Sequence, residues 1–306
     1  MKGNDIMTDS MKHCTICPRN CDVNRYEGVK GYCHAGLLPK CALASVHKWE
    51  EPPISGTKGS GTVFFSHCNL NCVFCQNNTI SAEGFGKTLT IENLADVFLS
   101  QQKKCVHNIN LVSPTHFIPQ VRQAILLAKS KGLSIPIVYN TNAYEKVESL
   151  KLLEGLIDVY LPDLKYVSAE YSKEFSHAPD YFEYAKYAIL EMKRQQPNDI
   201  FDENGILQKG VIIRHLVLPG CYKDSFAVLH WIKQNMGEDT YVSLLNQYTP
   251  MHKALEYKQI ARKLTTLEYQ KVVKYFFDVG LKNGFMQNKC SATSDYTPLF
   301  DLSGLP

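Results

Sequence analysis

Three cysteines lie within eight positions of one another in the segment HCNLNCVFC, as Cys68, Cys72 and Cys75. The C-x3-C-x2-C spacing puts three thiols on one short loop, and thiolates are ligands of zinc and of iron–sulfur clusters. Structural zinc needs a fourth ligand, and His67 is geometrically awkward because it directly precedes Cys68. A [4Fe–4S] cluster held by three thiolates instead leaves one iron open to a small molecule. The triplet therefore favours a catalytic cluster, with structural zinc as the alternative.

A second group of cysteines precedes the triplet. Cys14, Cys17, Cys21 and Cys33 follow the spacing C-x2-C-x3-C-x11-C. Four thiolates can close a tetrahedral zinc site or hold a second iron–sulfur cluster, and the residues leave both possibilities open. Residues 1–50 contain no long periodic segment, so a bound metal would have to replace an apolar core. We therefore predict a small cysteine-rich metal-binding module over 1–50, against the alternative of free cysteines in a flexible segment.

The composition excludes several classes of function. The chain has 306 residues, a formal net charge of +3 and scattered basic residues without a Lys/Arg run, so nucleic acid is not an expected partner. The first residues lack the apolar segment of a secretory signal, and no stretch approaches the ~18 apolar residues of a membrane span. Eleven cysteines in a chain without such a signal indicate metal binding in a reducing cytoplasm rather than disulfides.

The elements that must position the triplet alternate regularly after residue 60. Short β-rich runs are separated by segments with helical periodicity, which is typical of a parallel sheet with helical crossovers. The predicted strands are 61–66, 108–112, 135–140, 157–161, 211–217 and 241–246. The predicted helices begin near 90, 118, 145, 183, 224 and 265. Six units predict an α/β fold, a partial (βα)6 TIM-like barrel over 51–306, with a flat doubly wound sheet as the alternative.

Ligand sites of parallel α/β folds lie at the carboxyl ends of the strands. The cysteine triplet directly follows the first predicted strand, and Asn140, Asp163 and Lys165 follow later ones. His116 lies beyond the second strand. Arg214 and His215 are adjacent within the fifth strand, so one of them should face the barrel interior and the other a helix. We expect the strand-end side chains that face the interior, including at most one of Arg214 and His215, to lie at the site.

The cysteine motif and its place in the βα series resemble the radical SAM superfamily. The segments EEPPISGTKGSGTVFF, CVFCQN, SPTHF, PIVYNTNAY, DVYLPDLKY and RHLVLPG resemble a branch related to the pyruvate formate-lyase activating enzyme. The resemblance implies an oxidoreductase in which a [4Fe–4S] cluster reductively cleaves S-adenosyl-L-methionine (SAM) to a 5′-deoxyadenosyl radical for hydrogen abstraction. It also implies a flavodoxin- or ferredoxin-like electron donor and a protein substrate that receives a glycyl radical.

Individual roles carry over by position. Cys68, Cys72 and Cys75 would be the cluster ligands, and Asp163 and Lys165 would be catalytic, with Lys165 paired to the SAM carboxylate. The expected cofactor-binding residues are Asn110, Ser113, Thr115, His116, Asn140 and Asn142.

Some positions depart from the activating-enzyme pattern. Ser113-Pro114-Thr115-His116 stands where activating enzymes have Gly-Gly-Glu, Asn140 replaces an aspartate, and Gln247-Tyr248 replaces a histidine. Two alternatives therefore stay open: a radical SAM enzyme acting on another peptide or small molecule, and a metal-binding scaffold without catalysis.

Overall fold

The computed structural model describes residues 10–287 and 298–306, and within them one sheet of ten strands organises the chain. The first nine residues lie outside the described part. They are part of the predicted module, and the expectation about a secretory signal also concerns them. Six parallel strands pair in chain order: β2 (Ser60–Phe65), β4 (Ile109–Val112), β5 (Ile137–Thr141), β6 (Val159–Pro162), β8 (Leu207–Leu216) and β9 (Tyr241–Leu245). They coincide with the six predicted strands.

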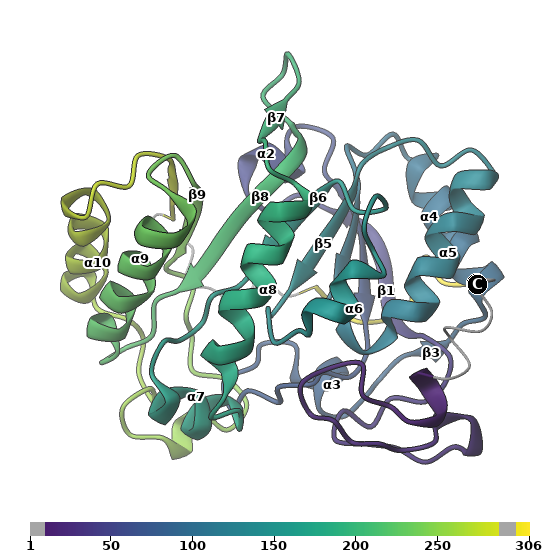
Figure 1. The fold of residues 1–306 in the computed structure, drawn as a ribbon, viewed down its shortest axis with the longest axis horizontal. Helices are drawn as coiled ribbons and strands as arrows, with labels where there is room; N and C mark the ends of the chain where they lie inside the picture. The colour runs from purple at the N-terminus through teal and green to yellow at the C-terminus, as the bar shows by residue number, and fades with distance from the viewer. Residues whose placement is uncertain (1–9, 288–297) are drawn as a thin grey trace.

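The strand order separates a barrel from a doubly wound sheet. A doubly wound sheet reverses its strand order at a switch point, whereas these six strands follow one another without reversal. The principal helices lie in front of the sheet in Figure 1, on one face. This arrangement confirms the partial (βα)6 barrel.

Four further strands extend the sheet. β1 (Lys40–His47) pairs antiparallel with β2, β3 (Lys87–Thr88) pairs with β1, β7 (Ile200–Phe201) pairs with β8, and β10 (Gly284–Met286) pairs parallel with β9. Because β1 ends at residue 47, the sheet reaches into the predicted module of residues 1–50. The division at residue 50 stays a prediction, and we propose that the cysteine-rich part ends before β1.

The crossover helices match the predicted periodicity. They are α4 (Ile91–Gln102), α5 (Ile118–Ser130), α6 (Val147–Lys151), α8 (Tyr181–Gln195), α9 (Tyr222–Met236) and α10 (Thr266–Asp278). The shorter elements are α2 (Pro52–Ser55), α3 (Asn78–Ser81), α7 (Ala169–Ser176), and the 3-10 turns at Arg25–Glu27, Thr115–Phe117 and Ala254–Glu256. α6 is shorter than its predicted range of 145–155, because the chain leaves it in successive turns before β6. No helix among the described residues is long and apolar enough to cross a membrane.

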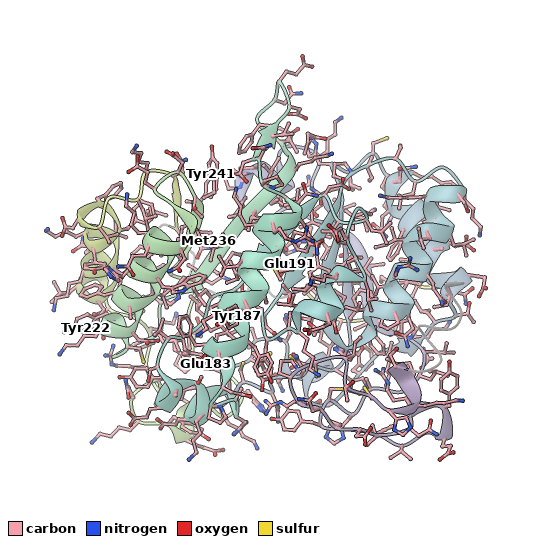
Figure 2. All side chains as sticks on the ribbon, viewed as in Figure 1. Glu183, Tyr187, Glu191, Tyr222, Met236 and Tyr241 are labelled. Carbon is pink, nitrogen blue, oxygen red and sulfur yellow. The ribbon has the colours of Figure 1, made fainter. Side chains whose placement is uncertain are left out.

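The amphipathic pattern of α8 shows how the helices cover the outer face of the sheet. Glu183, Tyr187 and Glu191 follow one another at four-residue intervals along this helix (Figure 2). Tyr187 is 57% exposed, whereas Ala188 and Ile189 are fully buried. The buried stripe packs against the outward-facing side chains of the strands, and the inward-facing side chains are left for the barrel interior.

Candidate active site

A cavity of about 250 Å³ opens inside the barrel at the carboxyl ends of the strands. The cysteine loop leaves β2 and borders this cavity, together with the ends of β4, β5, β6, β8 and β9. The lining contains eight predicted site residues: Cys68, Cys72, Cys75, Ser113, Asn140, Asn142, Asp163 and Lys165. Gln247 and Tyr248 also line it. Residues that are far apart in the sequence therefore converge on the cysteine triplet.

The cysteine loop is shaped by two residues in the left-handed region. His67 has φ 74° and Asn71 has φ 63°, so the chain reverses twice as it leaves β2. Asparagine tolerates this conformation because its short amide can bond locally. All three cysteines of this loop line the cavity.

Each thiol of the triplet has a polar side chain beside its sulfur. Asn142 Nδ2 donates to Cys68 Sγ at 3.4 Å, and Ser176 Oγ donates to Cys72 Sγ at 3.0 Å. Cys75 Sγ lies 3.2 Å from the Ser81 hydroxyl. Burial raises the pKa of the Cys72 thiol to about 12, and the nearby Lys165 ammonium acts in the opposite direction. Such donors stabilise a sulfur that carries negative charge, as a metal-bound thiolate does.

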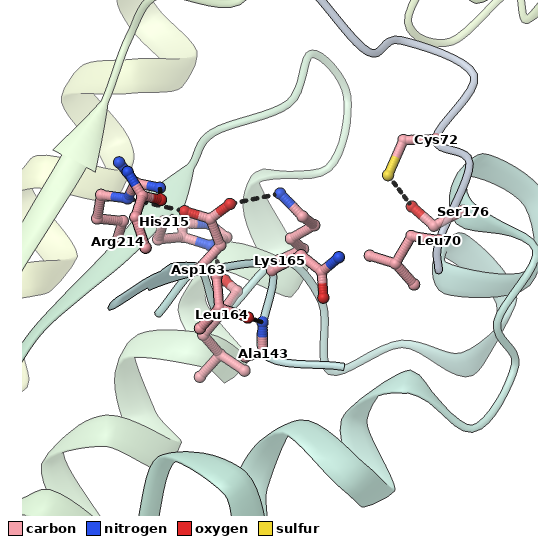
Figure 3. A network of polar contacts seen from close by, with 12 residues as sticks. Leu70, Cys72, Ala143, Asp163, Leu164, Lys165, Ser176, Arg214 and His215 are labelled. Carbon is pink, nitrogen blue, oxygen red and sulfur yellow. Dashed lines mark hydrogen bonds and ion pairs between the residues drawn. The ribbon is translucent and has the colours of Figure 1, made fainter. Parts of the chain in front are cut away.

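A network of charges lies beside the loop. Lys165 Nζ contacts Asp163 Oδ2 at 2.7 Å, and Arg214 Nε contacts Asp163 Oδ1 at 2.9 Å. Arg214 also reaches Glu50 Oε2 at 3.3 Å and donates to the Asn140 side chain. Figure 3 shows Lys165 between Asp163 and the Cys72–Ser176 pair. The network therefore places an ammonium group on the side of the cavity that carries the cysteines.

The protonation of these groups follows from their partners. Burial opposes charge on Asp163, but Arg214 and Lys165 outweigh it and hold the pKa of this carboxyl below its usual range. Burial also opposes charge on Lys165, but Asp163 and Cys72 raise the pKa of its ammonium. Burial raises the pKa of Glu50 despite the opposing effect of Arg214. Asp163, Lys165 and Arg214 are thus charged at neutral pH.

Three predicted cofactor-binding residues lie outside the cavity lining. Asn110 Nδ2 donates to Glu50 Oε1 at 3.0 Å, while its own Oδ1 is buried and has no hydrogen-bond partner among the described residues. Thr115 Oγ1 donates to Glu145 Oε1 at 2.8 Å, and His116 Nε2 lies 2.9 Å from the Ser66 carbonyl oxygen. Burial lowers the pKa of His116 to about 3, so its ring is neutral. A direct contact of these residues with a cofactor stays a prediction.

Arg214 and His215 point to opposite faces of the strand, as the alternation of adjacent side chains predicts. Arg214 lines the cavity, whereas His215 Nε2 lies 2.9 Å from the Ser225 hydroxyl of α9. His215 Nδ1 is 2.7 Å from the Leu164 carbonyl oxygen, so this ring joins a helix to the sheet. Arg214 therefore belongs to the site and His215 to the packing behind it.

The four cysteines of the N-terminal module lie near one another. Burial raises the pKa of Cys17 to about 12, and the neighbouring Cys33, Cys14 and Cys21 raise it further. Gly31 packs so closely on Cys21 that an added Cβ would lie 2.8 Å from its sulfur. Among the described residues, no three His, Cys, Asp or Glu side chains are grouped around a point that one metal ion would occupy. A metal in the module stays a prediction.

Sequence reasoning missed Glu50 and Ser176 as site residues. Glu50 lies in the segment EEPP, whose prolines indicate a linker, yet its side chain enters the barrel beside Arg214. Ser176 ends α7, a helix that was not predicted. The available signal for Glu50 was a pair of adjacent acidic residues ahead of the first barrel strand. Ser176 had no such sequence signal, because its partner Cys72 is distant in the sequence.

Comparisons with known proteins find a matching family model and two relatives of this chain. The family model described as the Radical SAM superfamily matches residues 62–220, more than half of the chain. The uncharacterized protein MJ0674 of Methanocaldococcus jannaschii is 31% identical over 283 residues, covering 88% of this chain and 76% of the relative. The uncharacterized protein MJ0808 of the same organism is 23% identical over 256 residues, covering 76% of this chain and 70% of the relative.

Two solved structures share the fold. Methylornithine synthase (PylB) superimposes with a TM-score of 0.52 at 14% identity, covering 79% of this chain and 73% of PylB. SuiB of Streptococcus suis, in a crystal structure with S-adenosylmethionine bound, superimposes with a TM-score of 0.50 at 15% identity. That match covers 72% of this chain and 48% of SuiB, so the chain spans about half the length of that protein.

Proposed function

The chain belongs to the radical SAM superfamily, and from this premise we propose that Cys68, Cys72 and Cys75 hold the [4Fe–4S] cluster and that SAM binds in the adjoining cavity. Membership of the superfamily implies the cluster, SAM and radical chemistry that begins with SAM cleavage. The positions of the ligands and of the SAM contacts are our proposal, since the comparisons identify the superfamily and the fold.

One observation carries the proposal: three thiols border a single cavity, and each has a hydroxyl or amide group at its sulfur. The donor set fits a cluster, because three thiolates leave one iron open and hydrogen bonds to sulfur stabilise the bound thiolate. When bound, the cluster supplies one electron to the sulfonium of SAM, and SAM supplies the radical that takes a hydrogen atom from the substrate.

The chain's own residues orient SAM in this proposal. Lys165 offers an ammonium group to the SAM carboxylate, and its ion pair with Asp163 keeps that ammonium charged and directed into the cavity. Arg214 holds the other oxygen of Asp163, so the aspartate bridges two cations. Asn142 joins the cysteine loop to the end of β5 through the Asn69 side chain at 2.9 Å. These contacts restrict the motion of SAM and of the loop during the reaction.

For the substrate we propose a polypeptide, as in an activating enzyme that generates a glycyl radical. The sequence segments that resemble the activating-enzyme branch support this proposal. SuiB, which shares the fold, has been crystallised with its precursor peptide SuiA, which makes a polypeptide plausible for this fold. The changed residues at Ser113–His116 and at Asn140 favour a different substrate, so a small molecule is the competing candidate.

The first test is anaerobic reconstitution with iron and sulfide, reduction with dithionite, and assay of 5′-deoxyadenosine after addition of SAM. Wild-type protein and Cys105→Ser, which changes an exposed cysteine outside the cavity, should form deoxyadenosine. Cys72→Ala should lose the product and the SAM-dependent change in the electron paramagnetic resonance (EPR) spectrum. A reconstituted cluster whose spectrum never responds to SAM would refute the enzyme and favour the metal-binding scaffold.

The substrate class requires a second measurement. Incubation with a candidate glycyl-radical enzyme should produce the EPR signal of a glycyl radical and raise the yield of deoxyadenosine. Deoxyadenosine formation that responds to small metabolites and to no polypeptide would overturn the proposed substrate while leaving SAM cleavage intact.

We propose that the N-terminal module binds zinc or a second cluster through Cys14, Cys17, Cys21 and Cys33. The mutual proximity of the four thiols and the burial of Cys14 and Cys17 support a shared ligand. The described side chains are not grouped around one point, so binding of zinc would require them to turn toward it. Metal analysis of reconstituted protein distinguishes the two: about four irons with one zinc per chain, or about eight irons without zinc. Four irons and no zinc would refute both.

A further inference from the structure

An arginine of the cysteine-rich module reaches into the active-site loop. Arg19 lies between Cys17 and Cys21, and its Nε donates to the Asn69 carbonyl oxygen at 2.8 Å. Its Nη2 lies 3.4 Å from the Leu70 carbonyl oxygen. Asn69 and Leu70 are inside the loop between Cys68 and Cys72, so this guanidinium holds the backbone that carries two of the proposed cluster ligands.

The same guanidinium holds a second segment. Arg19 Nη1 donates to the His177 carbonyl oxygen at 2.6 Å, and Nη2 lies 3.4 Å from the Ser176 carbonyl oxygen. These carbonyls end α7, where a helix leaves its last acceptors without partners and a cation is favoured. Ser176 is also the residue whose hydroxyl contacts Cys72 Sγ. Arg19 therefore links the two segments that carry Cys72 and the hydroxyl beside its sulfur, together with the backbone bond from Val73 N–H to the Phe175 carbonyl oxygen at 2.9 Å.

A tyrosine of the module reinforces the contact. The Arg19 guanidinium lies 3.8 Å from the centre of the Tyr32 ring, and the Tyr32 hydroxyl donates to the Leu70 carbonyl oxygen at 3.2 Å. Tyr32 directly precedes Cys33, and its backbone N–H lies 3.2 Å from Cys21 Sγ. Both side chains thus emerge from between the module's cysteines and meet at the same loop. The module lies at the end of the sheet that also carries α3 and α7 (Figure 1).

The module contacts the barrel at other points as well, where Arg25 Nη1 donates to the His116 carbonyl oxygen at 2.7 Å. Ser149 Oγ of α6 donates to the Ile16 carbonyl oxygen at 2.6 Å, and Lys146 contacts the Asn20 side chain. Because these contacts already attach the module to the barrel, the multiple contacts of Arg19 to the loop and α7 serve more than attachment. A planar guanidinium with several fixed donors is suited to holding several carbonyls in one geometry.

We propose that Arg19, supported by Tyr32, is a positioning residue through which the cysteine-rich module holds the Cys68–Cys72 loop and the end of α7 in the arrangement that receives the cluster. This inference rests on the proposed role of the loop as the cluster site. It assigns the module a structural function in the active site.

The test uses hydrogen–deuterium exchange of the full-length protein, reduced and free of metal. Arg19→Ala should speed exchange of the backbone amides from Leu70 to Cys72 roughly ten- to a hundredfold, because the Asn69 and Leu70 carbonyl oxygens lose the guanidinium donors that hold this part of the loop. Lys146→Ala, which removes another contact between module and barrel, should leave this exchange unchanged. Equal exchange of the loop in wild type and Arg19→Ala would overturn the proposal.

Milder variants cover the case in which Arg19→Ala does not fold. Tyr32→Phe keeps the ring beneath the guanidinium and removes one donor to Leu70, so a smaller acceleration of loop exchange is expected. Arg19→Lys keeps the charge without the planar fork and should rescue stability while leaving loop exchange fast. Wild-type exchange in both variants would refute the positioning role.

A spectroscopic measurement separates positioning from general stability. After reconstitution, Arg19→Lys should show a shifted or broadened EPR spectrum of the reduced cluster, whereas Lys146→Ala should match wild type. Wild-type spectra in every Arg19 variant would overturn the inference. The exchange experiment is done without metal, so it tests the positioning role of Arg19 independently of the cluster. The Cys72→Ala experiment tests whether the triplet holds the cluster. Failure of the positioning role can therefore be distinguished from failure of the proposed cluster site.

Discussion

Asp163 offers the sharpest test of the charge network. Its carboxylate receives Lys165 at 2.7 Å and Arg214 at 2.9 Å, and its side chain is 20% exposed. Asp163→Asn keeps the shape and removes the negative charge, so both cations lose their shared partner. Removing one partner of a buried ion pair costs about 3 to 5 kcal/mol. Since Glu50 still faces Arg214 and some solvent reaches the site, we expect about 3 kcal/mol of lost stability.

The assay is urea unfolding of the metal-free protein, with the midpoint and slope fitted together. Asp96→Asn is the matched control, because Asp96 receives Lys131 at 2.9 Å but is 59% exposed. An exposed pair contributes about 0.2 to 1 kcal/mol, so this control should lose much less stability than Asp163→Asn. A loss from Asp163→Asn no larger than that of the control would refute the assignment of a tightly coupled network.

The same substitution has a defined pH dependence. The pKa of Asp163 is held below the ordinary aspartate value of about 4, so its ion pairs stabilise the folded state fully above that pH. This contribution disappears as the pH falls through the lowered pKa. The difference in unfolding free energy between wild type and Asp163→Asn should therefore be largest near pH 7 and shrink below about pH 4. A difference that stays constant down to pH 2 would contradict the reasoning.

Three further predictions follow from individual contacts. Ser176→Ala removes the donor to Cys72 Sγ and should lower the midpoint potential of the reconstituted cluster by about 30 to 60 mV in an EPR-monitored titration. Ser172→Ala, on the same helix, should leave that potential unchanged. Burial raises the pKa of Glu145 to about 7, so the folded state holds this proton more tightly than the unfolded state. The resulting stability is fully present at low pH and is lost as the pH rises from about 4 to 7. Glu145→Gln should therefore flatten the decline of the unfolding free energy over this pH range, measured by urea unfolding. Thr265→Ala breaks the capping box of α10 and should cost about 1 kcal/mol by the same assay, and an unchanged midpoint would refute a stabilising cap.

The order of the elements could be predicted because its signals are local. Continuous apolar runs mark strands buried on both faces, and helical periodicity marks the crossovers between them. The start of α10 near residue 265 was predicted for the same reason, because Thr265 and Glu268, which form its capping box, lie within one turn. α7 was not predicted, because its eight residues, Ala169–Ser176, are too few for a clear periodic pattern. β1 was not predicted either, and it is held in the sheet by pairing with β2.

The sequence by itself determined the chemistry available to this protein: three thiols on one loop, placed after the first strand of a six-unit parallel sheet. Tertiary structure decided which side chains meet those thiols. Ser176 lies beside Cys72, Glu50 beside Arg214, and Arg19 beside Asn69, although each pair is separated by many residues. The physical reason is that spacing and periodicity act over a few residues, whereas these contacts form once packing of the whole sheet has fixed the relative positions of its strand ends.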